Sequence, residues 1–368
     1  MTAGTASRIA FIGLRWTFLA LAFTAGCPVL ALARTGDAPA TTGAANAPVA
    51  THEGGMVFAA DERGQSISVI DPASGKVETV CVGIAPHNIQ ASSDGAMLFA
   101  VGILAGEDHD MAAAMSIRRR LLVLNSTAVA RKPVADIEVG CMLAHVIVDK
   151  PGARAFVTNG GDNAVSVIDL AARQVVKSIA VGSLPHGLRM SPDGRTIHVA
   201  NTGDGTVSVV NVADLAEIAR IPVGKRPVQV AFTPDGRRSY VTLRDKNSTA
   251  VIDTASRQVI AKVQVGPGPI QVFAAPNSRE VYVANQGTKA ALGNTVSVID
   301  TASQAVVAEI VNGAGAHGVV VSTSGDRVFI ANTFADTMSV VDPATRQVVR
   351  SIPVGAGPGG ITFIPARQ

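Results

Sequence analysis

Short apolar segments separated by turn-forming residues recur along the chain from Gly55 to its end. The cleanest unit begins at Val181, contains four such segments and reads VGSLPHGLRMSPDGRTIHVANTGDGTVSVVNVADLAEIARIPVG. Val and Ile dominate these segments and favour β-strands, whereas turns such as SPDG at 191–194 contain Pro and Gly. No segment has the periodicity of an amphipathic helix. The pattern therefore predicts an all-β protein made of a repeated four-stranded unit.

The strands of this unit can be placed from its recurring motifs. The second strand is expected at 156–159, 198–201, 282–285 and 329–332, the third at 165–169 and 296–300, and the fourth, for example, at 348–354. Because Val and Ile occupy nearly every strand position, both faces of these strands are expected to be buried, as they are in stacked sheets.

A glycine marks each boundary between units, at Gly83, Gly140, Gly182, Gly224, Gly266, Gly313 and Gly355. Most intervals are 42 residues, a length with four strands that is typical of a propeller blade. Gly355 is followed by only one strand, and the stretch from Gly55 to Gly83 holds the other three. The sequence thus predicts a seven-bladed β-propeller over residues 55–368, with the last blade closed by both termini.

The residues before this propeller have a different composition. Arg8 and Arg15 precede an apolar run that ends in Ala31-Leu32-Ala33, which predicts a secretory signal peptide cleaved after Ala33 and a periplasmic or secreted protein. An uncleaved anchor and a lipoprotein signal using Cys27 are the alternatives. Residues 34–54 are rich in Ala, Thr, Gly and Pro and predict a flexible linker.

Composition excludes several classes of protein. The chain has 368 residues, of which 47% are hydrophobic and 16% are charged, so it can bury a large core. Its net charge is +3, and removal of residues 1–33 would leave +1, which gives no electrostatic footprint for nucleic acid. We expect no membrane span once the signal is removed, and a monomer.

The PHG, SPDG, VANT and VSVID elements resemble the YVTN family of seven-bladed β-propellers over about residues 55–368. That family includes secreted and periplasmic binding proteins, surface-layer proteins and relatives of the haem d1 and nitrous oxide reductase propellers. The resemblance implies the fold; it does not decide the function.

Histidines recur where the innermost strand of a blade meets the central channel. They stand four residues after the boundary glycine at His87, His186 and His317, and five residues after it at His145, where we infer one extra residue. A chain with 7 histidines would place four of them there by chance only rarely. Shared ancestry of the blades, with each ring bonded to nearby backbone, is an alternative explanation.

If these imidazoles converge, they could bind copper or another transition metal, or, as a weaker alternative, haem. The remaining option is that the histidines bind an organic ligand or that one of them acts as a general acid or base. The first blade has 15 surplus residues in a loop on the same face, where His109 lies among Glu107, Asp108 and Asp110, so His109 joins the candidate metal ligands. The fifth blade carries a second insertion at 286–294 on that face.

Three further residues are candidates for ligand binding on this face. Arg226 and Arg244 lie in loops of the fourth blade, where histidine is missing, and could clamp an anion; Asp61 is a candidate because it is one of the few acids expected there. Cys81 and Cys141 belong to neighbouring blades, and they could form a disulfide, remain as buried thiols, or place Cys141 beside His145 as a metal ligand. The repeat phases of the two cysteines differ, which favours buried thiols.

Several motifs are absent from the sequence. It contains no CxxCH for covalent haem and no GxSxG serine nucleophile. The favoured hypothesis is therefore an exported binding or scaffold propeller whose histidine-rich face takes a metal, a cofactor, a small ligand or a partner protein. The alternative is an enzyme, a metal or haem oxidoreductase or a lactonase-type hydrolase, acting at the same face with no catalytic residue assigned.

Overall fold

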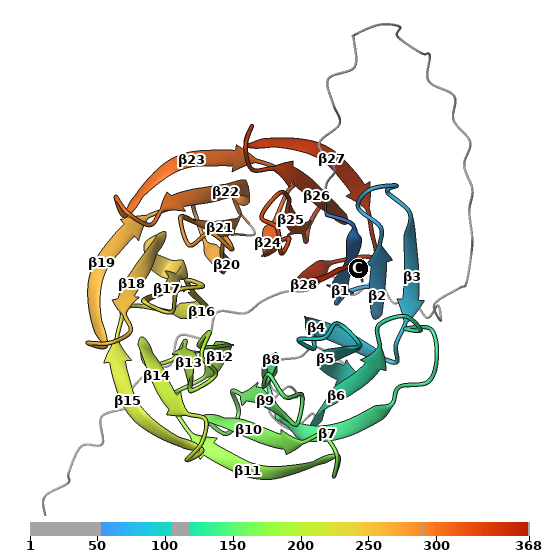
Figure 1. Ribbon diagram of the computed structural model, residues 1–368, viewed down its shortest axis with the longest axis vertical. Helices are drawn as coiled ribbons and strands as arrows, with labels where there is room; N and C mark the ends of the chain where they lie inside the picture. The colour runs from blue at the N-terminus through green and yellow to red at the C-terminus, as the bar shows by residue number, and fades with distance from the viewer. Residues whose placement is uncertain (1–52, 105–117, 289, 367–368) are drawn as a thin grey trace, which may run out of the picture. The chain divides into compact units, whose positions relative to one another are not determined.

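Seven four-stranded antiparallel sheets surround a central channel, as blades surround the hub of a propeller (Figure 1). The computed structural model describes residues 53–104, 118–288 and 290–366. In this part of the chain there is no α-helix, and a 3₁₀ turn, η1 (Arg244–Lys246), lies within the fourth blade. The prediction of a seven-bladed β-propeller is confirmed.

From the channel outwards, each sheet has an innermost, a second, a third and an outermost strand. The innermost strands are β4 (Ile84–Ala91), β8 (Leu143–Val148), β12 (Pro185–Met190), β16 (Pro227–Phe232), β20 (Pro269–Ala274), β24 (Ala316–Val321) and β28 (Pro358–Pro365). The second strands are β5 (Met97–Leu104), β9 (Arg154–Asn159), β13 (Thr196–Asn201), β17 (Arg238–Leu243), β21 (Glu280–Gly287), β25 (Val328–Asn332) and β1 (Gly55–Asp61). The third strands are β6 (Arg118–Asn125), β10 (Ala164–Asp169), β14 (Thr206–Asn211), β18 (Ser248–Asp253), β22 (Leu292–Asp300), β26 (Thr337–Asp342) and β2 (Ser66–Ile70). The outermost strands are β7 (Ala135–Cys141), β11 (Gln174–Ala180), β15 (Ala216–Pro222), β19 (Gln258–Gln264), β23 (Ala305–Val311), β27 (Gln347–Pro353) and β3 (Val77–Cys81).

The seventh blade joins the two ends of the chain. Its strand order is β28-β1-β2-β3, and β1 pairs with β28 in antiparallel register, with Val57 opposite Phe363. This pairing completes the seventh blade from both ends of the chain and closes the ring. The closure inferred from the repeat spacing is therefore confirmed.

Burial falls from the channel to the rim. Residues of the second and third strands, such as Val199 and Val207, are fully buried between neighbouring blades. On the outermost strands, by contrast, Val176 and Ile260 are each 50% exposed. The prediction that every strand is buried on both faces is wrong for these outermost strands, because no further strand covers them.

A side-chain hydrogen bond recurs at the end of the second strand. In the third blade, Asn201 Nδ2 donates to Thr206 Oγ1 and Ser208 Oγ, each at 2.9 Å. The closing blade has Asp61 at the corresponding place, and its carboxylate accepts from Ser66 Oγ at 3.1 Å and from Ser68 Oγ at 2.7 Å. Asp61 is therefore part of the framework that holds its blade together.

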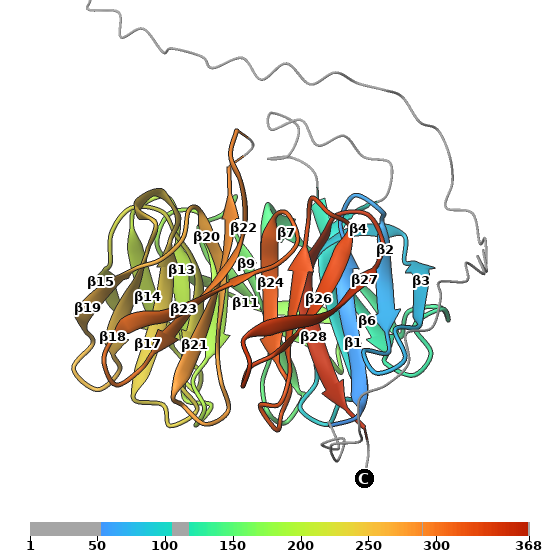
Figure 2. The same cartoon turned by 90° about the horizontal axis from the view of Figure 1, so that it is seen from above.

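The two predicted loop insertions lie in the fifth and first blades. The fifth-blade insertion lengthens the hairpin of β21 and β22, which projects beyond the neighbouring loops on one face of the ring (Figure 2). The first-blade insertion, with Glu107, Asp108, His109 and Asp110, lies outside the described residues. None of the helical structure described is long and apolar enough to cross a bilayer.

Candidate functional site

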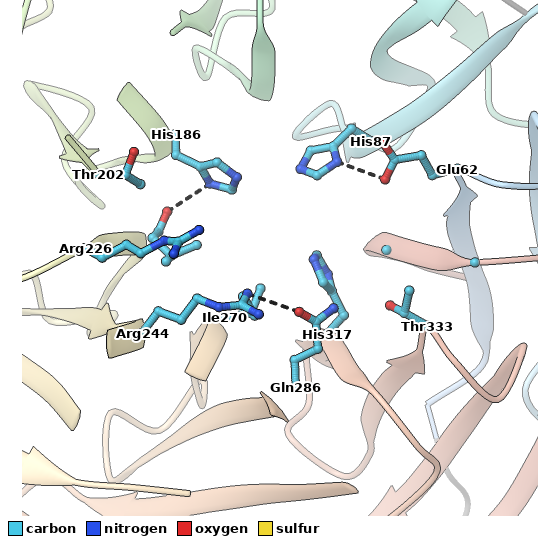
Figure 3. A pocket seen from close by; sticks show the side chains of 13 residues that line it. Glu62, His87, His186, Thr202, Arg226, Arg244, Ile270, Gln286, His317 and Thr333 are labelled. Atoms are coloured by element: carbon cyan, nitrogen blue, oxygen red, sulfur yellow. Dashed lines mark hydrogen bonds and ion pairs between the residues drawn. The ribbon is translucent and has the colours of Figure 1, made fainter. Parts of the chain in front are cut away.

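Three of the predicted hub histidines lie at equivalent places in their blades. The residues just before them, Pro86, Pro185 and Ala316, pair with the corresponding position of the second strand in each blade. The side chains of His87, His186 and His317 line a cavity of about 360 Å³ at the channel mouth (Figure 3).

His145 lies one position further along its strand. Leu143 pairs with Asn159 just as Pro185 pairs with Asn201, so Ala144 is equivalent to His186, and His145 is equivalent to Gly187. The extra residue that we inferred in this blade is absent, and that inference was wrong. His145 is only 3% exposed and belongs to the layer of the channel beneath the mouth.

The four imidazoles nevertheless converge. The ring centroid of His87 lies 5.8 Å from that of His145, 5.7 Å from that of His186 and 6.3 Å from that of His317. The centroids of His145 and His186 are 5.1 Å apart. One ring nitrogen from each of His87, His145 and His186 lies within 4.8 Å of the other two. The tertiary structure thus gathers imidazoles from the first, second, third and sixth blades into one cluster.

Neighbouring blades fix two of these rings through Nδ1. His87 Nδ1 is 3.1 Å from Glu62 Oε2, and His186 Nδ1 donates to the backbone oxygen of Val228 at 3.2 Å. Each ring is thereby held with its proton on Nδ1 and with the lone pair of Nε2 available. Imidazoles that ligate metals are typically held in this way by a carboxylate or a backbone carbonyl.

His145 is held differently. Gln229 Nε2 lies 3.2 Å from His145 Nδ1, and Gln229 Oε1 accepts from the backbone N–H of Val230 at 2.8 Å. Because Val230 fixes the orientation of the amide, Gln229 donates to Nδ1, and neutral His145 carries its proton on Nε2. His145 could offer Nε2 to a metal only after its proton has moved to Nδ1 and Gln229 has turned.

Burial keeps three of the rings neutral. Burial first, and then the neighbouring histidines, hold the pKa of His145 well below its ordinary value and lower the pKa of His186 to about 3. The pKa of His317 falls to about 4, mainly through burial. Burial also opposes the charged form of His87, but the charge and hydrogen bond of Glu62 outweigh it, so the pKa of His87 is raised. His317 is 8% exposed, and its Nδ1 has no partner among the described residues.

Arg226 and Arg244 line the same cavity, on the fourth-blade side (Figure 3). Arg244 donates from Nη1 to Gln286 Oε1 at 3.1 Å and from Nη2 to the backbone oxygen of Gly287 at 3.2 Å. Arg226 Nη1 lies 3.6 Å from Asp245 Oδ1. The structure therefore brings both arginines to the cavity that the histidines line.

Asp61 does not line this cavity. Its side chain is fully buried against Ser66 and Ser68, and burial raises its pKa to about 7, more than those hydrogen bonds lower it. The acid that reaches the cavity is the next residue, Glu62. Sequence reasoning named Asp61 because both acids share one loop, and the alternation of side chains at the end of β1 decides which of them faces the channel.

The sequence analysis did not identify two partly buried arginines and a buried glutamine. Arg119 donates to the backbone oxygen of Leu143 at 3.1 Å, and its buried Nε has no partner among the described residues. Arg189 donates to Gln90 Oε1 at 2.9 Å, its guanidinium carbon lies 5.9 Å from the ring centroid of Phe273, and burial lowers its pKa to about 10. Gln229 directly follows a channel-mouth position, which is the one signal that could have identified it.

The cysteines do not form the disulfide that we considered. Cys141 carries a thiol and is half-buried, whereas Cys81 is exposed. The two residues are therefore not bonded to each other, and the prediction of two buried thiols is also wrong. Both cysteines lie at the ends of outermost strands, where burial is lowest.

Comparison with known proteins agrees with the fold. Residues 230–366 match the family model of the Cytochrome D1 heme domain. Hydrazine synthase of Kuenenia stuttgartiensis is 20% identical, with a TM-score of 0.65 over 77% of this chain and 96% of that one. A putative 6-phosphogluconolactonase from Bacteroides fragilis NCTC 9343 is 14% identical, with a TM-score of 0.69 over 86% of this chain and 100% of that one. No curated protein matches the chain.

The described lining does not fit a haem in the channel mouth. The imidazoles pack against one another with centroids 5.1 to 6.3 Å apart, which leaves no flat slot between them for a macrocycle. Among the described residues that line the cavity, none is Phe, Tyr or Trp, so they offer no large aromatic ring to cover a macrocycle. The chain is a seven-bladed β-propeller that is similar, over residues 230–366, to the Cytochrome D1 heme domain.

Proposed function

We propose that the protein binds one transition-metal ion, copper or zinc, at the channel mouth. Nε2 of His87 and Nε2 of His186 are the primary ligands, and His145 is the third. The observation that carries this proposal is the pair of rings fixed through Nδ1, with a third ring nitrogen within 4.8 Å of both. Neutral imidazole is a ligand that suits both metals.

Closing the three rings on an ion requires modest ring rotations, together with the proton shift on His145 and the turn of Gln229. Two nitrogens that each lie about 2.1 Å from one zinc ion are at most about 4.2 Å apart. Nitrogens within 4.8 Å of one another therefore need modest ring rotations. Glu62 increases the basicity of His87 and offsets part of the charge of the bound cation, as a carboxylate behind a ligating histidine generally does.

Metal titration of the purified protein tests this proposal. We expect one Cu²⁺ or Zn²⁺ ion per chain, and an affinity at least about tenfold lower in His87→Ala and in His186→Ala. His198→Gln is the matched control, because His198 is also buried but its Nδ1 faces Ser239 Oγ at 3.0 Å, outside the cluster. Equal binding by His186→Ala and the wild type would refute the proposal.

An enzymatic role at the same cavity is the second candidate, favoured by the pairing of His87 with Glu62. A histidine whose pKa is raised by a carboxylate can act as a general acid or base near neutral pH. Metal binding and catalysis would take place in the same cavity. A reaction catalysed there would therefore depend on His87, as metal binding does.

Export is a further part of the proposal and rests on the sequence of residues 1–33. If those residues direct secretion, the N-terminal residue of the protein recovered from the periplasm or medium is Arg34. N-terminal sequencing of the recovered protein measures this. Recovery of the intact chain from the cytoplasm alone would contradict export, whatever the metal titration shows.

A further inference from the structure

We propose that the channel-mouth cavity also binds a small organic carboxylate, whose carboxylate group pairs with Arg244 and Arg226 and whose apolar stem covers Val228 and Ile270. The inference deepens the proposed function and rests on it for the place of the site, because both ligands share one cavity.

The charge of the cavity points to an anion. Arg244 is more than half buried, and its hydrogen bonds go to two neutral acceptors, the side chain of Gln286 and the backbone of Gly287. Asp245, 3.6 Å from Arg226, is a single carboxylate beside two guanidinium groups. On the opposite side of the cavity, Glu62 is hydrogen-bonded to His87. The fourth-blade side therefore keeps an excess positive charge, and a bound metal ion would increase it.

The planar arrangement of the guanidinium N–H donors favours a planar anion. A guanidinium presents paired N–H groups that match the two oxygens of a carboxylate. Arg226 and Arg244 both extend towards the centre of the cavity from the fourth blade (Figure 3). Burial of Arg244 also limits the water that competes for these hydrogen bonds, which strengthens a charge-assisted contact.

The wall beside these arginines is apolar. Val228 and Ile270 occupy the positions at which the first, third and sixth blades carry histidine, and they are 5% and 4% exposed. An inorganic oxyanion would leave this wall bare, whereas a short alkyl chain would cover it. His317 lines the same cavity, and its ring can contact the far end of the ligand.

Calorimetric titration of the metal-free full chain with acetate, butyrate and inorganic phosphate tests the inference. We expect butyrate to bind up to about tenfold more tightly than acetate, because two methylene groups lie on the apolar wall. Arg244→Gln should weaken butyrate binding by about tenfold or more, and Arg244→Lys should restore it only in part. Arg195→Gln, which alters an arginine whose side chain is 86% exposed, should have no effect.

The variants also separate this inference from the metal site. Ile270→Ala should reduce the preference for butyrate over acetate, and His186→Ala should bind butyrate while losing the metal. The inference is overturned if the wild type binds no butyrate, if phosphate binds more tightly than butyrate, or if Arg244→Gln binds butyrate as the wild type does. Failure of the metal titration with butyrate binding intact would refute the metal site alone.

Discussion

Asp61→Asn is expected to stabilise the propeller, and the gain in the free energy of unfolding should grow by about 3 kcal/mol between pH 5 and pH 8. Burial raises the pKa of Asp61 from 3.8 to about 7. The folded state prefers the neutral carboxyl of Asp61. This preference stabilises the fold fully below pH 3.8, and the stabilisation is lost as the pH rises through 7. Asparagine has no charge to bury at any pH, and the same position in other blades shows that it fits the site.

Urea unfolding at the two pH values measures this effect. Asn285→Asp in the fifth blade is the matched control, because Asn285 donates to Thr295 Oγ1 at 3.0 Å and to Ser297 Oγ at 2.9 Å in the arrangement that Asp61 imitates. That variant should be destabilised more at pH 8 than at pH 5. A stability change in Asp61→Asn that does not vary between pH 5 and pH 8 would show that the carboxylate is not buried as described.

Metal affinity should fall about tenfold for each pH unit below the raised pKa of His87. A proton and a metal ion compete for this ring, whereas the lowered pKa values of His145, His186 and His317 keep those rings neutral over the same range. One proton should therefore be released for each ion that binds. Zinc titration against a competing chelator, repeated across pH 5 to 8, measures this slope.

Glu62→Gln should move the midpoint of that pH profile to lower pH. The charged groups that affect His87 are Glu62, which raises its pKa, and Arg119, which lowers it, together with the neutral rings packed around it. Without the carboxylate, burial lowers the pKa of His87, so binding persists into more acidic solution. At neutral pH the variant should bind about tenfold more weakly, because the ring is less firmly oriented. If metal affinity depends on pH in the same way in Glu62→Gln and in the wild type, Glu62 does not influence the metal site.

Much of the fold was predictable from the sequence for a physical reason. Each blade is a local unit whose strands pair with their sequence neighbours, so apolar segments, turn residues and a fixed period were enough to identify it. The closing blade could be inferred because the two ends of the chain contain complementary parts of one unit. Burial at the rim was misjudged, since the same Val- and Ile-rich pattern continues onto strands that nothing covers, and the extra residue inferred in the second blade is absent.

The position of the candidate site was predictable from the sequence, but only some of the residues that form it were. Repeat position alone brought His87, His186 and His317 to the channel mouth, and loop position brought Arg226 and Arg244 there. A one-residue shift places His145 in the deeper layer, and the alternation of β1 places Glu62, rather than Asp61, in the cavity. A strand turns successive side chains in opposite directions, so an error of one residue changes what a side chain faces.

The sequence by itself thus determined the number of blades, the closure of the ring and the face on which the histidines gather, because these depend on local pairing and repeat length. The tertiary structure alone decided which ring nitrogens are fixed, which histidines are neutral and which partly buried arginines have neutral partners. Those properties arise from contacts between blades, some of them adjacent and others further apart in the chain, such as Gln229 with His145 and Arg189 with Gln90. No repeat pattern encodes such contacts, because they depend on how seven blades meet around one channel.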